Sequence, residues 1–131
     1  GACMRYLSLI DIPATLRRST SVEQFLGKSP VDAACVRHVE LRPANDCIEV
    51  WIYDVEDVGS EDYSDLHDFA YFEPDGPCAP AFIFADAAAA VTYASTFLAA
   101  DPTRWTNLGI AESEYLDYLR AGRPSHWPVA I

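Results

Sequence analysis

Two runs of strand-forming residues, separated by a short turn, place the strongest constraint on how this chain folds. Residues 36–41 and 47–55 are rich in β-branched and aromatic residues, while residues 43–46 read Pro-Ala-Asn-Asp. Val, Ile, Tyr and Trp favour the pleated backbone of a strand, and Pro, Asn and Asp favour turns. The sequence therefore predicts an antiparallel hairpin, around which the rest of the fold is built.

Side chains of the second predicted strand alternate between two faces. Aliphatic residues occupy one face, which we assign to a hydrophobic core: Ile48, Val50 and Ile52. The opposite face carries Glu49, Trp51 and Tyr53. Large aromatic side chains are usually buried, so this second face either packs under a helix or stays partly open to solvent.

Helical patterns come late in the chain. Residues 87–100 follow Asp86, a good N-cap, and residues 112–121 end at Gly122, a common helix terminator. Because strands cluster early and helices late, we predict the α+β class. The specific prediction is a small antiparallel sheet around residues 36–55 with the two C-terminal helices packed mainly on one face.

The remaining segments give weaker patterns. Residues 4–12 predict a strand, and residues 22–26 predict a short turn of helix. Residues 58–68 combine acids with Gly and Ser and fit either a loop or a short helical turn. Residues 67–73 then predict a return to strand, and residues 82–84 resume an apolar strand or lead into the next helix.

Length and composition favour one independently folding unit. The chain has 131 residues, half of them hydrophobic, so we expect a single domain spanning residues 1–131. Residues 1–3 precede Met4, which has the character of a natural start, and we interpret them as a cloning remnant. No apolar run reaches the roughly 18 residues needed to span a bilayer, and no secretory signal opens the chain. These features predict a cytoplasmic protein without a membrane partner.

The cysteines carry no signature of a metal site. Cys3, Cys35, Cys47 and Cys78 are widely spaced and form no C-x-x-C pair. Cys35 and Cys47 flank the predicted hairpin, so they either face each other across its strands or are reduced, buried thiols. The second alternative is the usual one in a reducing compartment.

Negative charge is concentrated in one third of the chain. The net charge is −11, and residues 43–76 contain eleven Asp and Glu but no Lys or Arg. Such a segment either projects a negative field or borrows cations from elsewhere in the fold. Duplex nucleic acid is disfavoured as a direct ligand, because its binding proteins use excess Lys and Arg to displace counterions. A basic partner protein fits this charge much better.

Signatures of catalysis and of metal binding are missing from the sequence. It contains no phosphate-binding glycine loop and no G-x-S-x-G motif. His38, His67 and His126 lie in unlike contexts, and Asp65, His67 and Asp68 are too close in sequence to converge easily on one ion. We therefore predict no catalytic residue, no metal, no cofactor and no enzymatic activity.

Part of the chain resembles a family of bacterial inhibitors. Residues 82–118 contain an aromatic-flanked Asp-Ala-Ala helix start, an Arg-Trp-Thr-Asn turn at 104–107 and a Glu114-Tyr115 helix, downstream of the hairpin segment LRPANDCIEVWIYDVED. With these features the chain resembles immunity proteins of polymorphic or contact-dependent growth inhibition toxins. The resemblance implies a cytosolic inhibitor that blocks a toxin domain, often a nuclease.

Charge and aromatic content lead to the same kind of partner. A nuclease toxin binds phosphates in a basic cleft, and an acidic surface with aromatic anchors gives both steering and affinity. The acidic run that follows the hairpin, together with the aromatic residues beside it, is the candidate toxin-binding surface: Trp51, Tyr53, Asp54, Glu56, Asp57, Glu61, Asp62, Tyr63, Asp65 and Asp68. Tyr71 and Phe72 follow nearby as further aromatic anchors.

Three other functions fit the sequence less well. A nucleic-acid mimic is expected to carry carboxylates over its whole surface and not over one third of the chain. A small enzyme needs a pocket with convergent polar groups, for which the region of Asp65, His67 and Asp68 is the place to look. An acidic protein-interaction module of another kind shares the composition, and a toxin gene immediately upstream distinguishes an immunity protein from it.

Overall fold

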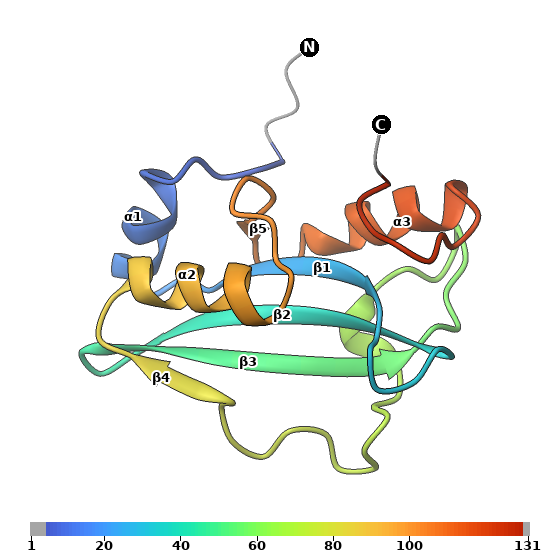
Figure 1. Ribbon diagram of the computed structural model, residues 1–131, viewed down its shortest axis with the longest axis horizontal. Coiled ribbons are helices and arrows are strands. Elements are labelled where there is room, and N and C mark those ends of the chain that lie inside the picture. The colour runs from blue at the N-terminus through green and yellow to red at the C-terminus, as the bar shows by residue number, and fades with distance from the viewer. Residues whose placement is uncertain (1–4, 130–131) are drawn as a thin grey trace.

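A computed structural model describes residues 5–129 as one antiparallel sheet with helices on both of its faces (Figure 1). The strands run in the order β4-β3-β2-β1-β5. Their bounds are β1 Val22–Lys28, β2 Cys35–Ala44, β3 Cys47–Glu56, β4 Phe82–Phe84 and β5 Thr106–Asn107. The helices are α1 Asp11–Arg17, α2 Ala87–Phe97 and α3 Ala111–Arg120, with a 3-10 turn η1 at Leu66–Asp68. The α+β class and the small antiparallel sheet are confirmed.

The predicted hairpin is confirmed as the centre of the sheet. Strands β2 and β3 pair without interruption from Cys35 opposite Glu56 to Ala44 opposite Cys47. Pro43 is tolerated within β2 because pairing with β1 already stops at Leu41, so no neighbouring strand needs its missing N–H on that side. Cys35 and Cys47 therefore lie at opposite ends of the hairpin, and both are free thiols.

The N-terminal third differs from the sequence-based prediction. Residues 22–26 belong to strand β1, not to a helix, because they pair with β2 on one side and with β5 on the other. Residues 4–12 do not form a strand in their described part. Helix α1 begins at Asp11, and Pro13 fits its first turn because N–H groups there have no helical partner. Tyr6 contributes one isolated bridge, to Thr106.

Alternation along β2 and β3 produces two hydrophobic clusters, one on each face of the sheet. The first contains Val39, Leu41 and Val50 with residues of α1 and α2, including Ala90 and Ala94. In the second cluster, side chains on the other face of β2 and β3 pack against residues of η1 and α3. Its members include Val36, Tyr53, Val55, Leu66, Tyr115 and Tyr118. The aliphatic face predicted for β3 is thus confirmed as core.

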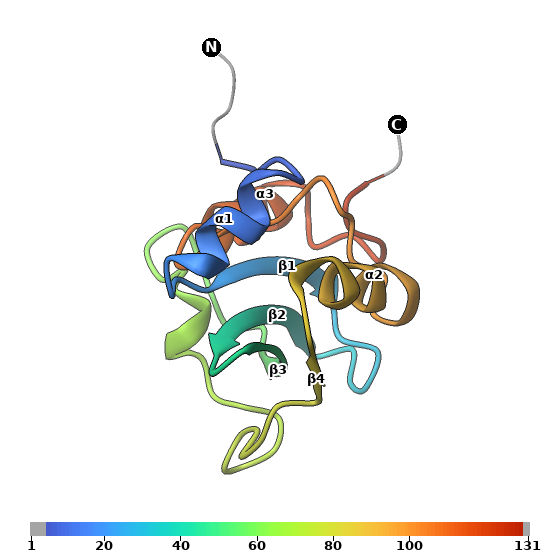
Figure 2. The same cartoon turned by 90° about the vertical axis from the view of Figure 1, so that its left-hand side faces the viewer.

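The two C-terminal helices do not share a face as the sequence had suggested. Helix α2 belongs to the first cluster and α3 to the second, so each face of the sheet receives one of them. In Figure 2 the sheet is seen close to edge-on, with α2 on one side and the green η1 turn on the other. The physical reason is that β2 and β3 are apolar on both faces, and each face needs a cover.

Among residues 5–129, no helix has the length and hydrophobicity required to cross a bilayer.

Candidate partner-binding surface

The acidic segment, defined here as residues 54–75, leaves β3 and folds back over the face that carries α3. Its return path pairs with the end of β3, because the Phe72 amide donates to the Asp54 carbonyl at 2.8 Å and the Glu56 amide to the Ala70 carbonyl at 2.8 Å. The predicted return to strand over residues 67–73 is thereby reduced to one isolated bridge, between Val55 and Tyr71. The segment is an ordered surface loop that contains η1.

Three predicted site carboxylates are neutralised by arginines from other parts of the chain. Arg37 binds Asp54 at 2.8 Å, Arg123 binds Asp57 at 2.9 Å and Arg120 binds Glu61 at 2.8 Å. The Arg120 guanidinium lowers the pKa of the Glu61 carboxyl. Part of the acidic segment is therefore neutralised by arginines that belong to β2, to α3 and to the residues after α3.

The other carboxylates of the predicted site face solvent. Glu56, Asp62, Asp65 and Asp68 are exposed and form no ion pair with any of residues 5–129. One Asp65 carboxylate oxygen already has an internal partner, because it accepts a hydrogen bond from the His67 amide at the start of η1. Both alternatives left open by the sequence hold at once: some acids are paired internally, and the rest project a negative field.

Tyr53 is a core residue and not an exposed anchor, which corrects its place among the candidate binding residues. Its side chain is 7% exposed, and its ring stacks on His38 with centroids 4.8 Å apart. Its hydroxyl donates to Glu40 at 2.8 Å, and burial raises its pKa. The cover comes from the acidic segment itself, because the rings of His67 and Tyr71 pack near Tyr53. Tyr53 is therefore covered by this segment with its η1 turn and is not open to solvent.

Trp51 is half-buried on the same face of β3. The Arg42 guanidinium lies 4.2 Å from its ring centroid, and its indole N–H donates to Glu49 at 3.0 Å. These contacts hold the indole in place, and Arg42 already covers part of its surface.

Exposed aromatic side chains do occur in the acidic segment, but further along it. Tyr63, Tyr71 and Phe72 are 43%, 39% and 42% exposed. The sequence placed Tyr63 in the candidate surface and Tyr71 and Phe72 beside it as further aromatic anchors.

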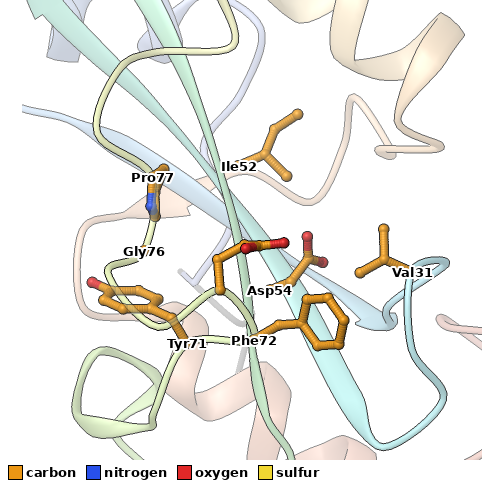
Figure 3. Close-up of a pocket in the computed structure, with 8 residues that line it drawn as sticks. Val31, Ile52, Asp54, Tyr71, Phe72, Gly76 and Pro77 are labelled. Carbon is orange, nitrogen blue, oxygen red and sulfur yellow. The ribbon is translucent and has the colours of Figure 1, made fainter.

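A pocket of about 170 Å³ lies beside Phe72, along the edge of β3 that β4 leaves uncovered. In Figure 3 the Asp54 carboxylate lies near the Phe72 ring and the Val31 side chain. Apolar walls and two carboxylates are combined in its lining: Val31, Ile52, Asp54, Tyr71, Phe72 and Glu73. A cationic side chain with an apolar stem matches this lining, because Lys and Arg bury their methylene groups while their charge stays near carboxylates.

The start of the acidic segment is fastened to α3. The Tyr115 hydroxyl accepts the Gly59 amide at 2.9 Å and donates to Asp57 at 2.5 Å. Arg123 donates to the Gly59 carbonyl at 3.0 Å. The segment is therefore held in a defined position, which reduces the ordering cost of binding a partner.

Replacing Gly59 by alanine tests this attachment. A Cβ atom there would lie 2.4 Å from Tyr115 Cε2 and 2.7 Å from Phe69 Cζ, both parts of buried rings. We expect the Gly59→Ala variant to lose about 1–3 kcal/mol of unfolding free energy. Urea denaturation measures it, and Ser60→Ala at the exposed neighbour is expected to stay within about 0.5 kcal/mol of wild type. Equal stability of the two variants would contradict the described packing.

One group of potential metal ligands lies on the face of the sheet beneath the acidic segment. Glu23, His38 and His67 each place one ligand atom within 4.8 Å of the others. Sequence spacing could not reveal this group, because β1 and β2 come together by strand pairing and η1 reaches them only when the acidic segment folds back over the sheet. The His67 ring contacts Glu23 at 3.0 Å. The convergence of His67 with Asp65 and Asp68, already disfavoured by the sequence, is not the arrangement found.

The two histidines have opposite electrostatic surroundings. The hydrogen bond that the His67 ring donates to the Glu23 carboxylate raises the pKa of His67. Burial lowers the pKa of His38 to about 3, with His67 acting in the same direction. His38 is 1% exposed, and neither of its ring nitrogens has a hydrogen-bond partner within the described part of the chain. An unpartnered polar group of this kind costs about 1–3 kcal/mol, so it demands an explanation.

Comparison of the chain with protein-family models, with curated proteins and with solved structures finds no match in any of the three. The function is therefore argued from the residues and geometry of this chain.

Proposed function

We propose that this protein is an immunity protein that binds and neutralises a bacterial toxin domain through its acidic segment, and that the toxin is a basic nuclease. One observation carries the proposal: the exposed rings of Tyr71 and Phe72 line a pocket together with Glu73, an exposed carboxylate that forms no ion pair with any of residues 5–129. Such a surface combines long-range attraction with short-range anchoring.

The charge distribution supports a cationic partner. Several carboxylates outside the acidic segment form ion pairs within the protein. Glu114 pairs with Arg104, and Glu40 pairs with Arg42. Within the segment, Glu56, Asp62 and Asp68 keep their charge for an outside partner. A nuclease has a basic cleft because it binds phosphates, and opposite potentials accelerate the encounter of two proteins.

The aromatic residues supply binding energy at the interface, which charge attraction alone does not provide. Interface energy is concentrated in a few buried anchors, with aromatic residues and Arg enriched among them. In the proposed complex a Lys or Arg of the toxin enters the pocket beside Phe72, with its stem against the ring and its charge near Glu73. Occupying a basic residue of the toxin cleft in this way blocks phosphate binding. The inhibitor itself then needs no catalytic group.

The decisive experiment starts from the neighbouring gene. An immunity protein is encoded beside its toxin and acts in the cytoplasm, where the toxin reaches its target. The toxin domain encoded immediately upstream is produced, and its nuclease activity is titrated with this protein. One-to-one inhibition is the expected result. A neighbouring gene without a toxin domain, or full activity at excess inhibitor, would contradict the proposal.

Truncation of Phe72 tests the anchor separately from the charge. Phe72→Ala removes one wall of the pocket, and we expect dissociation from the toxin domain to become about tenfold faster with little change in association. The matched control is Phe97→Ala at the end of α2, which removes an even more exposed ring from a different part of the fold. Stopped-flow or surface-plasmon kinetics give both rate constants. Equal dissociation rates in the two variants would exclude Phe72 as an anchor.

A further inference from the structure

We propose that Glu23, His38 and His67 form a binding site for a divalent transition-metal ion, Zn²⁺ in the first instance. This site is independent of the proposed toxin-binding function. It also reverses the expectation of no metal, which rested on the different sequence contexts of the histidines.

The ligand set and its spacing suit zinc. Two imidazoles and one carboxylate are among the ligands that Zn²⁺ takes in proteins, and three protein ligands leave a fourth position for water. The candidate ligand atoms lie within 4.8 Å of one another, and His67 Nε2 is 3.0 Å from Glu23 Oε1. Tetrahedral coordination at bonds of about 2.0–2.1 Å requires ligand atoms about 3.3 Å apart. The ligand atoms therefore have to approach one another by no more than about 1.5 Å to coordinate one ion.

His38 provides the second, independent observation. Its ring is buried against the rings of Tyr53 and His67, yet both nitrogens lack a hydrogen-bond partner among residues 5–129. A structural histidine would be expected to hydrogen-bond at least one of them. Its surroundings also keep the imidazole neutral, which is the form that binds metal. A metal ion at this position gives one orphaned nitrogen the partner it lacks.

Glu23 is already oriented as a ligand. Its Oε2 atom accepts the Gly109 amide at 2.8 Å and the Ala111 amide at 3.2 Å, so the carboxylate is fixed by backbone groups next to α3. This leaves Oε1 directed to His67. Outer hydrogen bonds of this kind set the orientation of metal ligands. His67 is the accessible member, with a side chain 39% exposed, and gives the ion a route from solvent.

Metal binding replaces the direct contact between His67 and Glu23. The Nε2 atom of His67 must be unprotonated to bind the ion, because its lone pair forms the bond to the metal. Ligand deprotonation makes metal affinity depend on pH, so binding is expected to weaken as the pH falls.

The test uses untagged, chelator-treated protein and Co²⁺ as a spectroscopic probe for Zn²⁺. We expect one ion per chain by equilibrium dialysis, an intense visible absorption of four-coordinate Co²⁺, its loss on adding Zn²⁺, and a higher melting temperature with Zn²⁺. His67→Ala alters an accessible residue, and His38→Phe preserves the buried ring. Each is expected to weaken binding by about tenfold or more.

His126→Ala is the matched control, because His126 is an exposed histidine outside the cluster. It is expected to bind Co²⁺ like wild type. Three results would overturn the proposal: no stoichiometric binding to wild type, unchanged affinity in His67→Ala, or thiolate charge-transfer absorption that assigns the ion to cysteine. If His38→Phe fails to fold, His67→Ala still decides the question.

Discussion

Replacing Glu114 by glutamine is expected to lower the free energy of unfolding by about 3 kcal/mol, because this carboxylate is the buried anion that joins three separate segments. Its side chain is 2% exposed. It accepts hydrogen bonds from Arg104 at 2.9 Å, from Arg5 at 3.3 Å and from the Trp127 indole at 3.0 Å, and the Tyr6 hydroxyl also donates to it.

The size of this effect follows from what the substitution leaves behind. Glutamine keeps the shape of the side chain but removes the negative charge between Arg5 and Arg104, whose side chains are only 21% and 26% exposed. Breaking a buried ion pair by removing one partner costs about 3–5 kcal/mol, and partial exposure of the arginines favours the lower end.

The control for this prediction is Asp117→Asn on the same helix. Asp117 also binds Arg5, at 2.7 Å, but its side chain is 40% exposed, so its loss is expected to cost less than about 1 kcal/mol. Urea denaturation with a common slope compares the two variants. Equal effects at positions 114 and 117 would show that burial does not set the strength of this network.

This network also gives a structural meaning to the residues behind the immunity-protein resemblance. Arg104 and Glu114, from the turn and the helix that carried the resemblance, bind each other. Trp105 and Tyr115 beside them are fully buried. These residues shape the fold, so the acidic segment and not the 104–118 region is the better candidate for contact with a partner.

The hairpin was predictable because its information is local. Alternation along residues 47–55 and the turn formers before them determine both strands without reference to the rest of the chain. Strand β1 was not predictable in this way, since one of its two neighbours is β5, far away in sequence. The short apolar run at 22–26 fits helix and strand equally well until those partners are known.

The candidate site was predictable in its charge but not in its details. The composition of residues 43–76 indicated an acidic surface. The acids that are neutralised are those that the fold places beside Arg37, Arg120 and Arg123. These contacts depend on the tertiary structure and cannot be read from the local sequence. The same reason hid the Glu23, His38 and His67 cluster, whose members come from three elements.

Reversing charge at two exposed acids is expected to slow association with the toxin domain at least about tenfold at low ionic strength. The suitable positions are Glu56 and Asp62, because both are exposed and neither pairs with an arginine. Glu61 and Asp65 are less suitable, since the first binds Arg120 and the second accepts the His67 amide. Stability is expected to change little, because no internal contact of these side chains is lost.

The control is a second double variant that changes the net charge by the same amount but at two acids outside the acidic segment. Asp11 begins α1 and Asp46 lies in the hairpin turn, and both are exposed. If only net charge mattered, Asp11→Lys with Asp46→Lys would slow association as strongly as Glu56→Lys with Asp62→Lys. A local binding surface predicts a much smaller effect for the control.

Association rate constants at low and at physiological ionic strength, measured for the wild type and both double variants against the toxin domain of the neighbouring gene, test the central claim most directly. The acidic segment as binding surface predicts slow, nearly salt-independent association for Glu56→Lys/Asp62→Lys, with wild-type-like salt dependence retained in the control. A folded Glu56→Lys/Asp62→Lys variant that associates as fast as wild type at both ionic strengths would contradict it.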